Sequence, residues 1–386
     1  MSTDAETADV VYVGTYSAPH TAPGESRPSQ ALGIYVFQRL EDGHLELLQT
    51  VPAENPSFLA ISPNRKTLYA VSEVGFGDDG QPLGKVLAFE RDLKTGKLVP
   101  LNSQATQGTW PCHLSVTADG AFLLAANYGS CNFVVFPLER DGRISAMSDA
   151  IDCLGAGPDT ARQSQSHPHF IAEIPDLGYI LGADLGTDQV HAWTLNASNG
   201  TLVPDTRASI QTAGGTGPRH LVVHPKSQHI IVLNELSSTI DVFSPASDKT
   251  TGPIWRQTLS TLPENSGFAR PVFDPSNPGF VAEGGNTTAE IRLHPNGQFL
   301  YVTNRGMNSI ASFRFDETFQ RLTPMEWTAT LGERPRGMNV SPDGRFLYVG
   351  NQGSGNIVGF AIDPQTGKLS DPLFDLPCPT PVDFVF

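Results

Sequence analysis

The sequence predicts an all-β fold, a seven-bladed β-propeller with four-stranded antiparallel blades. Three observations lead to this fold class: a short unit recurs along the chain, a second hairpin signal follows each copy, and turn-forming residues occur throughout. The 386 residues include 37 glycines and 31 prolines, spread evenly rather than gathered in linkers. Breakers at this frequency leave little room for long helices.

The recurring unit has the pattern of strand, turn and strand. Its clearest copy is SPDGRFLYVGNQ at 341–352, and HPNGQFLYVTNR at 294–305 matches it almost position for position. The Pro-Asp-Gly or Pro-Asn-Gly segment supplies turn chemistry, and FLYV is a short apolar strand. The other copies, in chain order, are the half unit VYVGTY at 11–16, then 62–73, 117–128, a weaker copy at 174–185, and 224–235.

A second hairpin signal follows each unit, as in 84–101, 131–147 and 356–372. Each repeat of about 50 residues therefore carries about four strands. One such sheet cannot bury both of its faces, whereas blades packed around an axis bury them and leave only short edges. The first copy lacks its opening strand, and CPTPVDFVF at 378–386 can supply it. We therefore expect both chain ends to meet in one blade, which closes the ring.

This organisation predicts a single domain over residues 1–386, with residues 1–8 as a tail. Two polar, Gly/Pro-rich insertions interrupt the repeat, at 17–32 and at 264–286. Long loops often cover or shape sites, and they are also tolerated as plain surface additions. Both interpretations of the insertions stay open at this point.

The overall charge restricts the partners. Lys and Arg total 25 against 40 Asp and Glu, which gives a net charge of −15. An acidic chain is unsuited to nucleic acid or anionic membranes, because both attract a basic surface. No run of about 18 apolar residues is present, so we expect no transmembrane helix. The start, MSTDAETADV, has neither a basic nor an apolar signal region, so we expect a cytoplasmic protein.

The repeat register predicts a site. Each innermost strand begins, and the next strand ends, on the same face of the ring, and we call this face the mouth. The blade interiors are apolar, whereas the mouth collects imidazole, guanidinium and carboxylate groups. These groups belong to His113, His167, His169, His220, Arg219, Arg305, Arg336, Glu73, Glu235 and Glu290. A cationic mouth on an acidic protein would attract a small anionic substrate.

Other kinds of chemistry lack support. The sequence contains no G-x-S-x-G segment for a serine hydrolase and no H-E-x-x-H segment for a zinc protease. Its four cysteines, Cys112, Cys131, Cys153 and Cys378, are too far apart for a C-x-x-C site or a disulfide framework. We therefore expect no metal and no cofactor.

The sequence strongly resembles the seven-bladed propeller lactonase family, whose bacterial members are known as 6-phosphogluconolactonases. Pro168 between His167 and His169 departs from the family pattern, as does the insertion at 17–32. The segments that carry the resemblance are VYVGTY (11–16), NPSFLAISPN (55–64), PCHLSVTADGAFLLAANY (111–128), ARQSQSHPH (161–169), DLGTDQV (184–190), GPRHLVVHP (217–225), LNELSSTIDVF (233–243), AEIRLHPNGQFLYVTNRG (289–306) and PRGMNVSPDGRFLYVGNQ (335–352).

The same family includes fungal enzymes that cyclise 3-carboxy-cis,cis-muconate to a lactone. For that branch the resemblance implies a mouth of one His, one Glu and two Arg. The matching positions are His169 or His167, together with Glu235, Arg219 and Arg305. The register argument places these residues on one face without using the family.

For a lactone hydrolase we expect His169 to be the base that activates water, with Glu235 orienting or assisting it. Arg219 is the expected oxyanion partner. Substrate-binding roles are expected for a further set of mouth residues. Arg305 and Arg336 would hold a phosphate or carboxylate, His113 and Asn127 would contact hydroxyls, and His167 and Glu290 complete the set.

Three hypotheses remain open. The first is hydrolysis of 6-phosphogluconolactone or a related sugar lactone, and the second is cycloisomerisation of a carboxymuconate by the same mouth. The third is a non-catalytic propeller that binds a partner across the mouth, which an exposed aromatic patch would favour. The mouth is charged, and only Trp110 and Tyr128 are aromatic there, so the enzymatic hypotheses are preferred.

Overall fold

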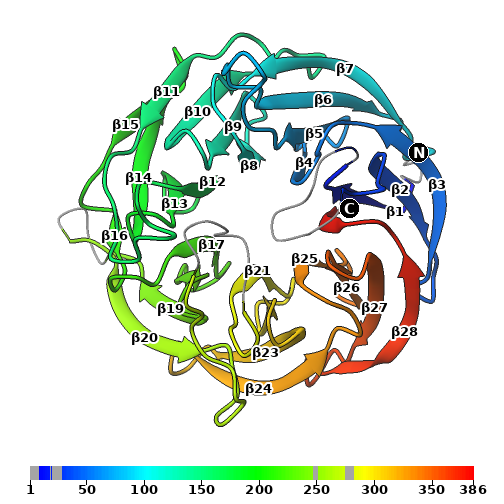
Figure 1. The fold of residues 1–386 in the computed structure, drawn as a ribbon, viewed down its shortest axis with the longest axis vertical. Helices are drawn as coiled ribbons and strands as arrows, with labels where there is room; N and C mark the ends of the chain where they lie inside the picture. The colour runs from blue at the N-terminus through cyan, green and yellow to red at the C-terminus, as the bar shows by residue number, and fades with distance from the viewer. Residues whose placement is uncertain (1–7, 18, 20–27, 247–250, 274–281) are drawn as a thin grey trace, which may run out of the picture.

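The computed structural model describes residues 8–17, 19, 28–246, 251–273 and 282–386. Seven antiparallel sheets form a closed ring, as the sequence predicts (Figure 1). The expected tail at 1–8 lies almost entirely outside the described residues, as do parts of the insertions at 17–32 and 264–286. The described residues include no helix of the length and apolarity that a membrane span requires.

The blades are numbered 1 to 7 from the one that holds both chain ends, and their strands are given from the innermost outward. Blade 1 consists of β29 (Pro381–Val385), β1 (Val10–Thr15), β2 (Gly33–Arg39) and β3 (Leu45–Pro52). Blade 2 consists of β4 (Leu59–Ile61), β5 (Thr67–Ser72), β6 (Lys85–Arg91) and β7 (Leu98–Ala105). Blade 3 consists of β8 (Pro111–Val116), β9 (Phe122–Asn127), β10 (Asn132–Pro137) and β11 (Asp149–Asp152).

Blade 4 differs from the others by a fifth strand, because the short β16 (Ile210–Gln211) pairs with β14. Its other strands are β12 (Pro168–Ile174), β13 (Tyr179–Asp184), β14 (Gln189–Asn196) and β15 (Thr201–Pro204). Blade 5 consists of β17 (Pro218–Val223), β18 (Ile230–Asn234), β19 (Thr239–Ser244) and β20 (Ile254–Ser260). Blade 6 consists of β21 (Thr288–Leu293), β22 (Phe299–Asn304), β23 (Ser309–Asp316) and β24 (Arg321–Ala329). Blade 7 consists of β25 (Pro335–Val340), β26 (Phe346–Asn351), β27 (Asn356–Ile362) and β28 (Leu369–Pro377).

The last strand closes the ring, as expected from the missing first strand of the first repeat. β29 is the innermost strand of blade 1 and pairs antiparallel with β1, with Val13 opposite Phe384. The two ends of the chain therefore share one sheet. Hydrogen bonds between these strands hold the ring together where the covalent chain does not.

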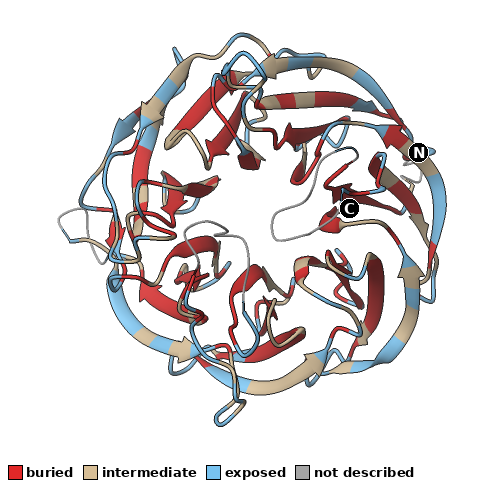
Figure 2. Cartoon of the chain, viewed as in Figure 1, coloured by how far each residue is buried: buried red, intermediate tan, exposed pale blue. Residues whose placement is uncertain are grey.

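The core lies between neighbouring blades. The second strands β5, β9, β22 and β26 are buried along their whole length, whereas the outermost strands β7 and β24 are half-buried or exposed at all but one residue each. Figure 2 shows this gradient from the ring interior to its rim. Tyr69 and Val71 of blade 2 pack with Leu123 and Val134 of blade 3 in one such layer. Burial of both faces explains the near-continuous apolar runs of the second strands.

Tyrosines join adjacent blades in a repeated way. In four blades the hydroxyl of a second-strand tyrosine donates a hydrogen bond, 2.6 to 2.9 Å long, to a glycine carbonyl in a hairpin of the next blade. These glycines have φ between 70° and 89°, so the turn requires glycine there. The pairs are Tyr12 and Gly96, Tyr69 and Gly142, Tyr301 and Gly367, and Tyr348 and Gly43.

A backbone irregularity recurs at the start of the innermost strands and orients the site. The pairing register shifts just after the leading proline of β8, β12, β17 and β25. A bulge of this kind redirects the side chain of the extra residue. The residues at these shifts are Cys112, His169, Arg219 and Arg336.

Candidate active site

A cavity of about 890 Å³ lies at the mouth, and every blade contributes to its lining. The described ends of the 264–286 insertion also line it, at 266–268 and 282–285, so this insertion shapes the site. The polar and aromatic side chains of the lining belong to Tyr16, Asn55, Glu73, Trp110, Cys112, Tyr128, Arg162, His169, Glu235, Ser266, Phe268, Glu283, Thr287, Arg305, Asn308, Glu333, Arg334 and Arg336.

Glu235 is the centre of the charged cluster in this cavity. Its Oε1 accepts from Nη2 of Arg162 at 2.6 Å and lies 2.9 Å from Nη2 of Arg305. Its Oε2 lies 3.0 Å from Nε of Arg219. All four side chains are largely buried, so solvent screens these ion pairs only weakly. One carboxylate therefore fixes three guanidinium groups that come from three different blades or loops.

The arginines keep Glu235 ionised. Burial alone would raise the pKa of its carboxyl, but Arg305, Arg162 and Arg219 outweigh burial and hold the pKa well below its usual range. A carboxylate with so low a pKa is a poor proton acceptor at neutral pH. Glu235 is therefore suited to positioning the arginines rather than to taking a proton.

Arg219 lies behind Glu235 and does not line the cavity. Its Nη1 donates to the carbonyl of Ala289 and to Nε2 of His220 at 3.2 Å. Its guanidinium thus holds the carboxylate from below. We expected Arg219 to contact a substrate oxyanion directly. This placement does not favour such a contact, because the Arg219 side chain is enclosed and already paired.

His169 lines the cavity beside Glu235 and is buried. Its Nδ1 has no hydrogen-bond partner among the described residues. Burial lowers the pKa of His169 well below the usual histidine value, and the charge of Arg219 lowers it further. The imidazole is therefore neutral at physiological pH, with a lone pair available to accept a proton.

A second buried carboxyl, that of Glu73, also lines the cavity. Its Oε1 accepts a hydrogen bond from the hydroxyl of Tyr16 at 2.9 Å, and its Oε2 accepts one from Ser57. Nη2 of Arg336 lies 4.0 Å from Oε1, and the Arg336 guanidinium stacks 5.2 Å from the centre of the Tyr16 ring. Burial raises the pKa of Glu73 despite the opposing charge of Arg336. The carboxyls of Glu235 and Glu73 thus have pKa values shifted in opposite directions.

Three predicted mouth residues form a buried layer that does not line the cavity. His113 packs between Phe58 and Phe170, and its Nδ1 accepts the backbone N–H of Ile171 at 3.2 Å. Nδ1 of His220 lies 3.1 Å from Oε1 of Glu290. Since none of these side chains reaches the cavity, the expected substrate contacts of His113 and Glu290 gain no support from their placement.

Asn127 and His167 also lie off the cavity wall. The amide of Asn127 donates to Oδ1 of Asn132 at 2.9 Å, which stabilises the turn between two strands. His167 stacks on Tyr128 with ring centres 4.2 Å apart, while His169 meets the edge of the same ring. Of the two histidines around Pro168, the structure therefore places His169 in the cavity.

Sequence reasoning missed Arg162 as a site residue. It lies in the loop between β11 and β12, outside the repeat register, and its guanidinium also stacks 4.8 Å from the ring centre of Phe273 in the 264–286 insertion. Its one signal was its place in the segment 161–169, which carries the family resemblance. Tyr16 was missed as well, because the first repeat has no complete register.

The described residues include one cluster of side chains that could hold a metal, and it lies outside the cavity. Its members are Cys153, Asp184 and His191. None of them lines the cavity.

Comparisons with known proteins agree with this geometry. The family model described as "Lactonase, 7-bladed beta-propeller" matches residues 10–386. The 6-phosphogluconolactonase of Bacillus subtilis is 32% identical over 329 residues, which cover 84% of this chain and 83% of that protein. The 6-phosphogluconolactonase of Formosa agariphila is 31% identical over 342 residues, covering 87% and 90% of the two chains.

A solved structure extends the likeness to three dimensions. The periplasmic gluconolactonase of Pseudomonas aeruginosa superposes with a TM-score of 0.84 at 27% identity, covering 98% of each chain. The similarity therefore spans the whole ring rather than a few blades.

Proposed function

Because the chain belongs to the seven-bladed β-propeller lactonase family and is a lactonase, we propose that it hydrolyses 6-phosphogluconolactone or a related sugar lactone at the mouth. The observation that carries this proposal is the cluster of Arg162, Arg219 and Arg305 on one buried carboxylate, next to the neutral imidazole of His169. The relatives named 6-phosphogluconolactonase support the phosphorylated substrate.

The cavity suits an anion. Arg162, Arg305 and Arg336 line it, and with Arg219 behind them they surround two buried carboxyls, Glu235 and Glu73. The other two carboxyls of the lining, Glu283 and Glu333, are exposed and lie outside this buried cluster. Guanidinium groups outnumber carboxyls in this cluster, so a net positive charge remains for a ligand. A guanidinium can donate two parallel hydrogen bonds to a phosphate or carboxylate. We assign Arg336 and Arg305 to this contact.

Hydrolysis requires a base and a partner for the developing oxyanion. His169 takes a proton from water as the water oxygen forms a bond to the lactone carbonyl carbon. The carbonyl oxygen becomes an oxyanion, which the cavity-facing guanidinium of Arg162 stabilises. The ring C–O bond then breaks, and the imidazolium of His169 returns its proton to the leaving alkoxide. No redox partner or cofactor enters this balance.

Glu235 acts through the arginines in this scheme. It holds Arg162 and Arg305 at fixed positions, and preorganised donors stabilise an oxyanion without reorganising during the reaction. Arg219 is a positioning residue, because it contacts the carboxylate and not the cavity. This assignment replaces the expected use of Glu235 as part of the base.

Direct assay tests the proposal. Purified protein is incubated with 6-phosphogluconolactone, with unphosphorylated gluconolactone and with 3-carboxy-cis,cis-muconate, and the spontaneous hydrolysis of each lactone is subtracted. We expect the highest kcat/KM for the phosphorylated lactone, because Arg336 and Arg305 offer two guanidiniums to an anion. Turnover of the muconate alone would instead establish the cycloisomerase hypothesis. Turnover of none of the three would refute both.

The cytoplasmic location and the absence of nucleic-acid or membrane partners remain predictions from the sequence. The lactone substrate is the one partner that the relatives support. A periplasmic enzyme is among the similar structures, so fractionation of the source cells is the measurement that decides the location.

A further inference from the structure

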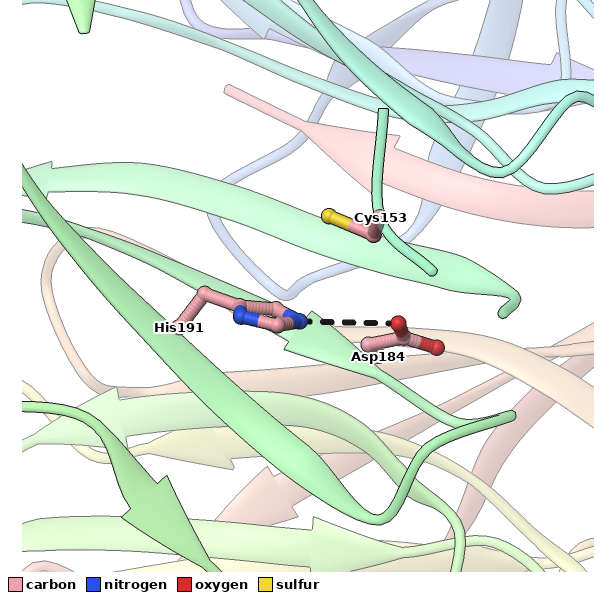
Figure 3. A group of neighbouring side chains, drawn as sticks. All are labelled: Cys153, Asp184 and His191. Carbon is pink, nitrogen blue, oxygen red and sulfur yellow. Dashed lines mark ion pairs between the residues drawn. The ribbon is translucent and has the colours of Figure 1, made fainter. Parts of the chain in front are cut away.

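The junction between blades 3 and 4 brings together a thiol, a carboxylate and an imidazole from separate strands. Cys153 follows β11, Asp184 ends β13 and His191 lies in β14. One possible ligand atom from each residue lies within 4.8 Å of the other two. Figure 3 shows the three side chains near one another between their strands. None of them lines the cavity described above.

The distance from His191 to Asp184 fits two ligands of one ion better than a hydrogen bond. Nε2 of His191 lies 3.5 Å from Oδ2 of Asp184, beyond the usual N–H···O range of about 2.7 to 3.2 Å. Two ligands bound tetrahedrally at about 2.0 to 2.1 Å from zinc are roughly 3.4 Å apart. The Nε2 atom is buried and has no hydrogen-bond partner among the described residues.

Hydrogen bonds hold the carboxylate of Asp184 in place but leave it able to accept a further partner. Its Oδ1 accepts from the backbone N–H of His167 at 2.7 Å and of Gly186 at 2.9 Å. Its Oδ2 accepts from Oγ of Ser166 at 2.6 Å, which leaves a lone pair on Oδ2 for a further partner. Outer hydrogen bonds that hold a ligand in place in this way are typical of metal sites.

The imidazole is oriented as well. The His191 ring lies 5.5 Å from the ring of Trp193 and meets the Phe133 ring edge-on at 6.2 Å. Its side chain is 22% exposed as a whole, whereas the Nε2 atom that would bind the ion is buried. The thiol of Cys131, in the turn before β10, instead donates to the carbonyl of Ser166 at 3.0 Å.

The junction between blades 3 and 4 differs in two residues from the equivalent junctions between other blades. At three other blade junctions the residue after an outermost strand is threonine, and its carbonyl accepts from an asparagine that ends the second strand of the next blade. Cys153 and Asp184 occupy these two positions, and an aspartate cannot donate as an asparagine does. The equivalent pairs are Thr106 and Asn127, Thr261 and Asn304, and Thr330 and Asn351.

We propose that Cys153, Asp184 and His191 form a binding site for a divalent zinc ion that joins blades 3 and 4. The sulfur, nitrogen and oxygen donors match the ligands that zinc takes in proteins, and water completes the tetrahedron. Binding forms a bond from the metal to Sγ of Cys153 and releases the thiol proton to solvent. The site stabilises the ring and takes no part in the chemistry of the cavity.

Cobalt(II) is the probe for the test, because a bound thiolate gives it a near-ultraviolet charge-transfer band. Reduced, chelator-treated full-length protein is titrated with cobalt(II), and zinc is then added to displace it. We expect the band to appear and then to disappear. We also expect zinc to raise Tm increasingly with its concentration.

The matched variants follow from the repeat. The double variant Cys153→Thr with Asp184→Asn restores the residue pair of the other junctions, so it should fold, and it should lose the band. Cys378→Thr is the control, since Cys378 is buried and occupies the same repeat position after β28. It should keep the band.

His191→Gln gives a second route that changes neither of the two junction positions. We expect it to weaken cobalt affinity roughly tenfold or more. No band in the wild-type protein, or an equal band in the double variant, would overturn the site. Loss of lactone hydrolysis on chelation would contradict its separation from the cavity. A failure of the proposed substrate assay would leave the cobalt result unaffected.

Discussion

Arg162 donates a hydrogen bond to Oε1 of Glu235 at 2.6 Å, although 73 positions separate the two residues in the chain. The donor comes from a loop outside the repeat, and the acceptor follows the second strand of blade 5. This contact makes an irregular loop part of a site whose other residues occupy repeated positions.

Arg162→Ala should lower kcat/KM for the lactone by roughly ten- to a hundredfold, because misplacement of catalytic groups by about 1 Å has effects of this size. Removal of the guanidinium leaves the Glu235 carboxylate with fewer donors, so Arg305 can shift. Steady-state kinetics on the true substrate measures the effect. Arg143→Ala is the control, since Arg143 is an exposed arginine paired with Asp141. Equal kinetics for the two variants would contradict a role for Arg162.

Glu235→Gln should destabilise the protein by about 3 to 5 kcal/mol, because it leaves three buried guanidiniums without their counter-charge. The free energy of unfolding from denaturant titration is the measurement. Glu73→Gln is the matched comparison and should cost less, since Glu73 has one arginine at 4.0 Å and two hydroxyl donors. A larger loss for Glu73→Gln would argue against Glu235 as the electrostatic centre.

The acid limb of the kcat/KM profile should lie below the ordinary histidine pKa of about 6.5. Burial first, and the charge of Arg219 second, lower the pKa of the proposed base His169. Arg219→Gln removes that charge and should move the limb to higher pH. An acid limb that stays in place in the variant would show that another group controls it. His169→Gln should reduce kcat by at least about a hundredfold.

Stability should decrease as the pH falls below about 6.5. The pKa values of His113, His169 and His220 are lowered well below the usual value, chiefly by burial. The unfolded chain therefore binds protons in this range that the folded chain does not, and protonation favours unfolding. Each such histidine contributes up to about 1.4 kcal/mol per pH unit.

Denaturant titrations at several pH values between 7.5 and 5 give the slope. A stability that is constant over this range would contradict the assignment of three buried neutral imidazoles.

Phe384→Ala should lower the free energy of unfolding by about 3 to 5 kcal/mol, because Phe384 is fully buried in β29 against Tyr348 and Val13. Phe386→Ala, two residues further on and only partly buried, is the control and should have a smaller effect. Urea or guanidinium unfolding measures both. Similar losses would mean that ring closure does not depend on packing of the last strand.

The repeat made most of the fold predictable. Seven copies of one unit determine the blade number, and the half unit at 11–16 indicates that the last residues must complete blade 1. The added strand β16 was not predicted, because two paired residues, Ile210 and Gln211, carry no periodic signal. Insertions likewise carry no register, so the contribution of 264–286 to the cavity had to be seen in the structure.

The site was predictable only in part. The register collected His169, Glu235, Arg305 and Arg336 at one face, and the structure brings these four into one cavity. The repeat register does not predict how deeply a side chain lies, because a position at the end of a strand is compatible with a side chain on the cavity wall or behind it. Arg219 and Asn127 are at such positions and lie off the wall, since each is paired by its neighbours.

Pairing of β29 with β1 has a consequence for biosynthesis. The innermost strand of the first blade is synthesised after the strands of all the other blades, so the ring stays open while those blades emerge. The cavity draws residues from every blade, from Tyr16 near the start to Arg336 near the end. A nascent chain thus cannot assemble the site blade by blade. Catalytic competence should appear only after β29 has been synthesised and has closed the ring.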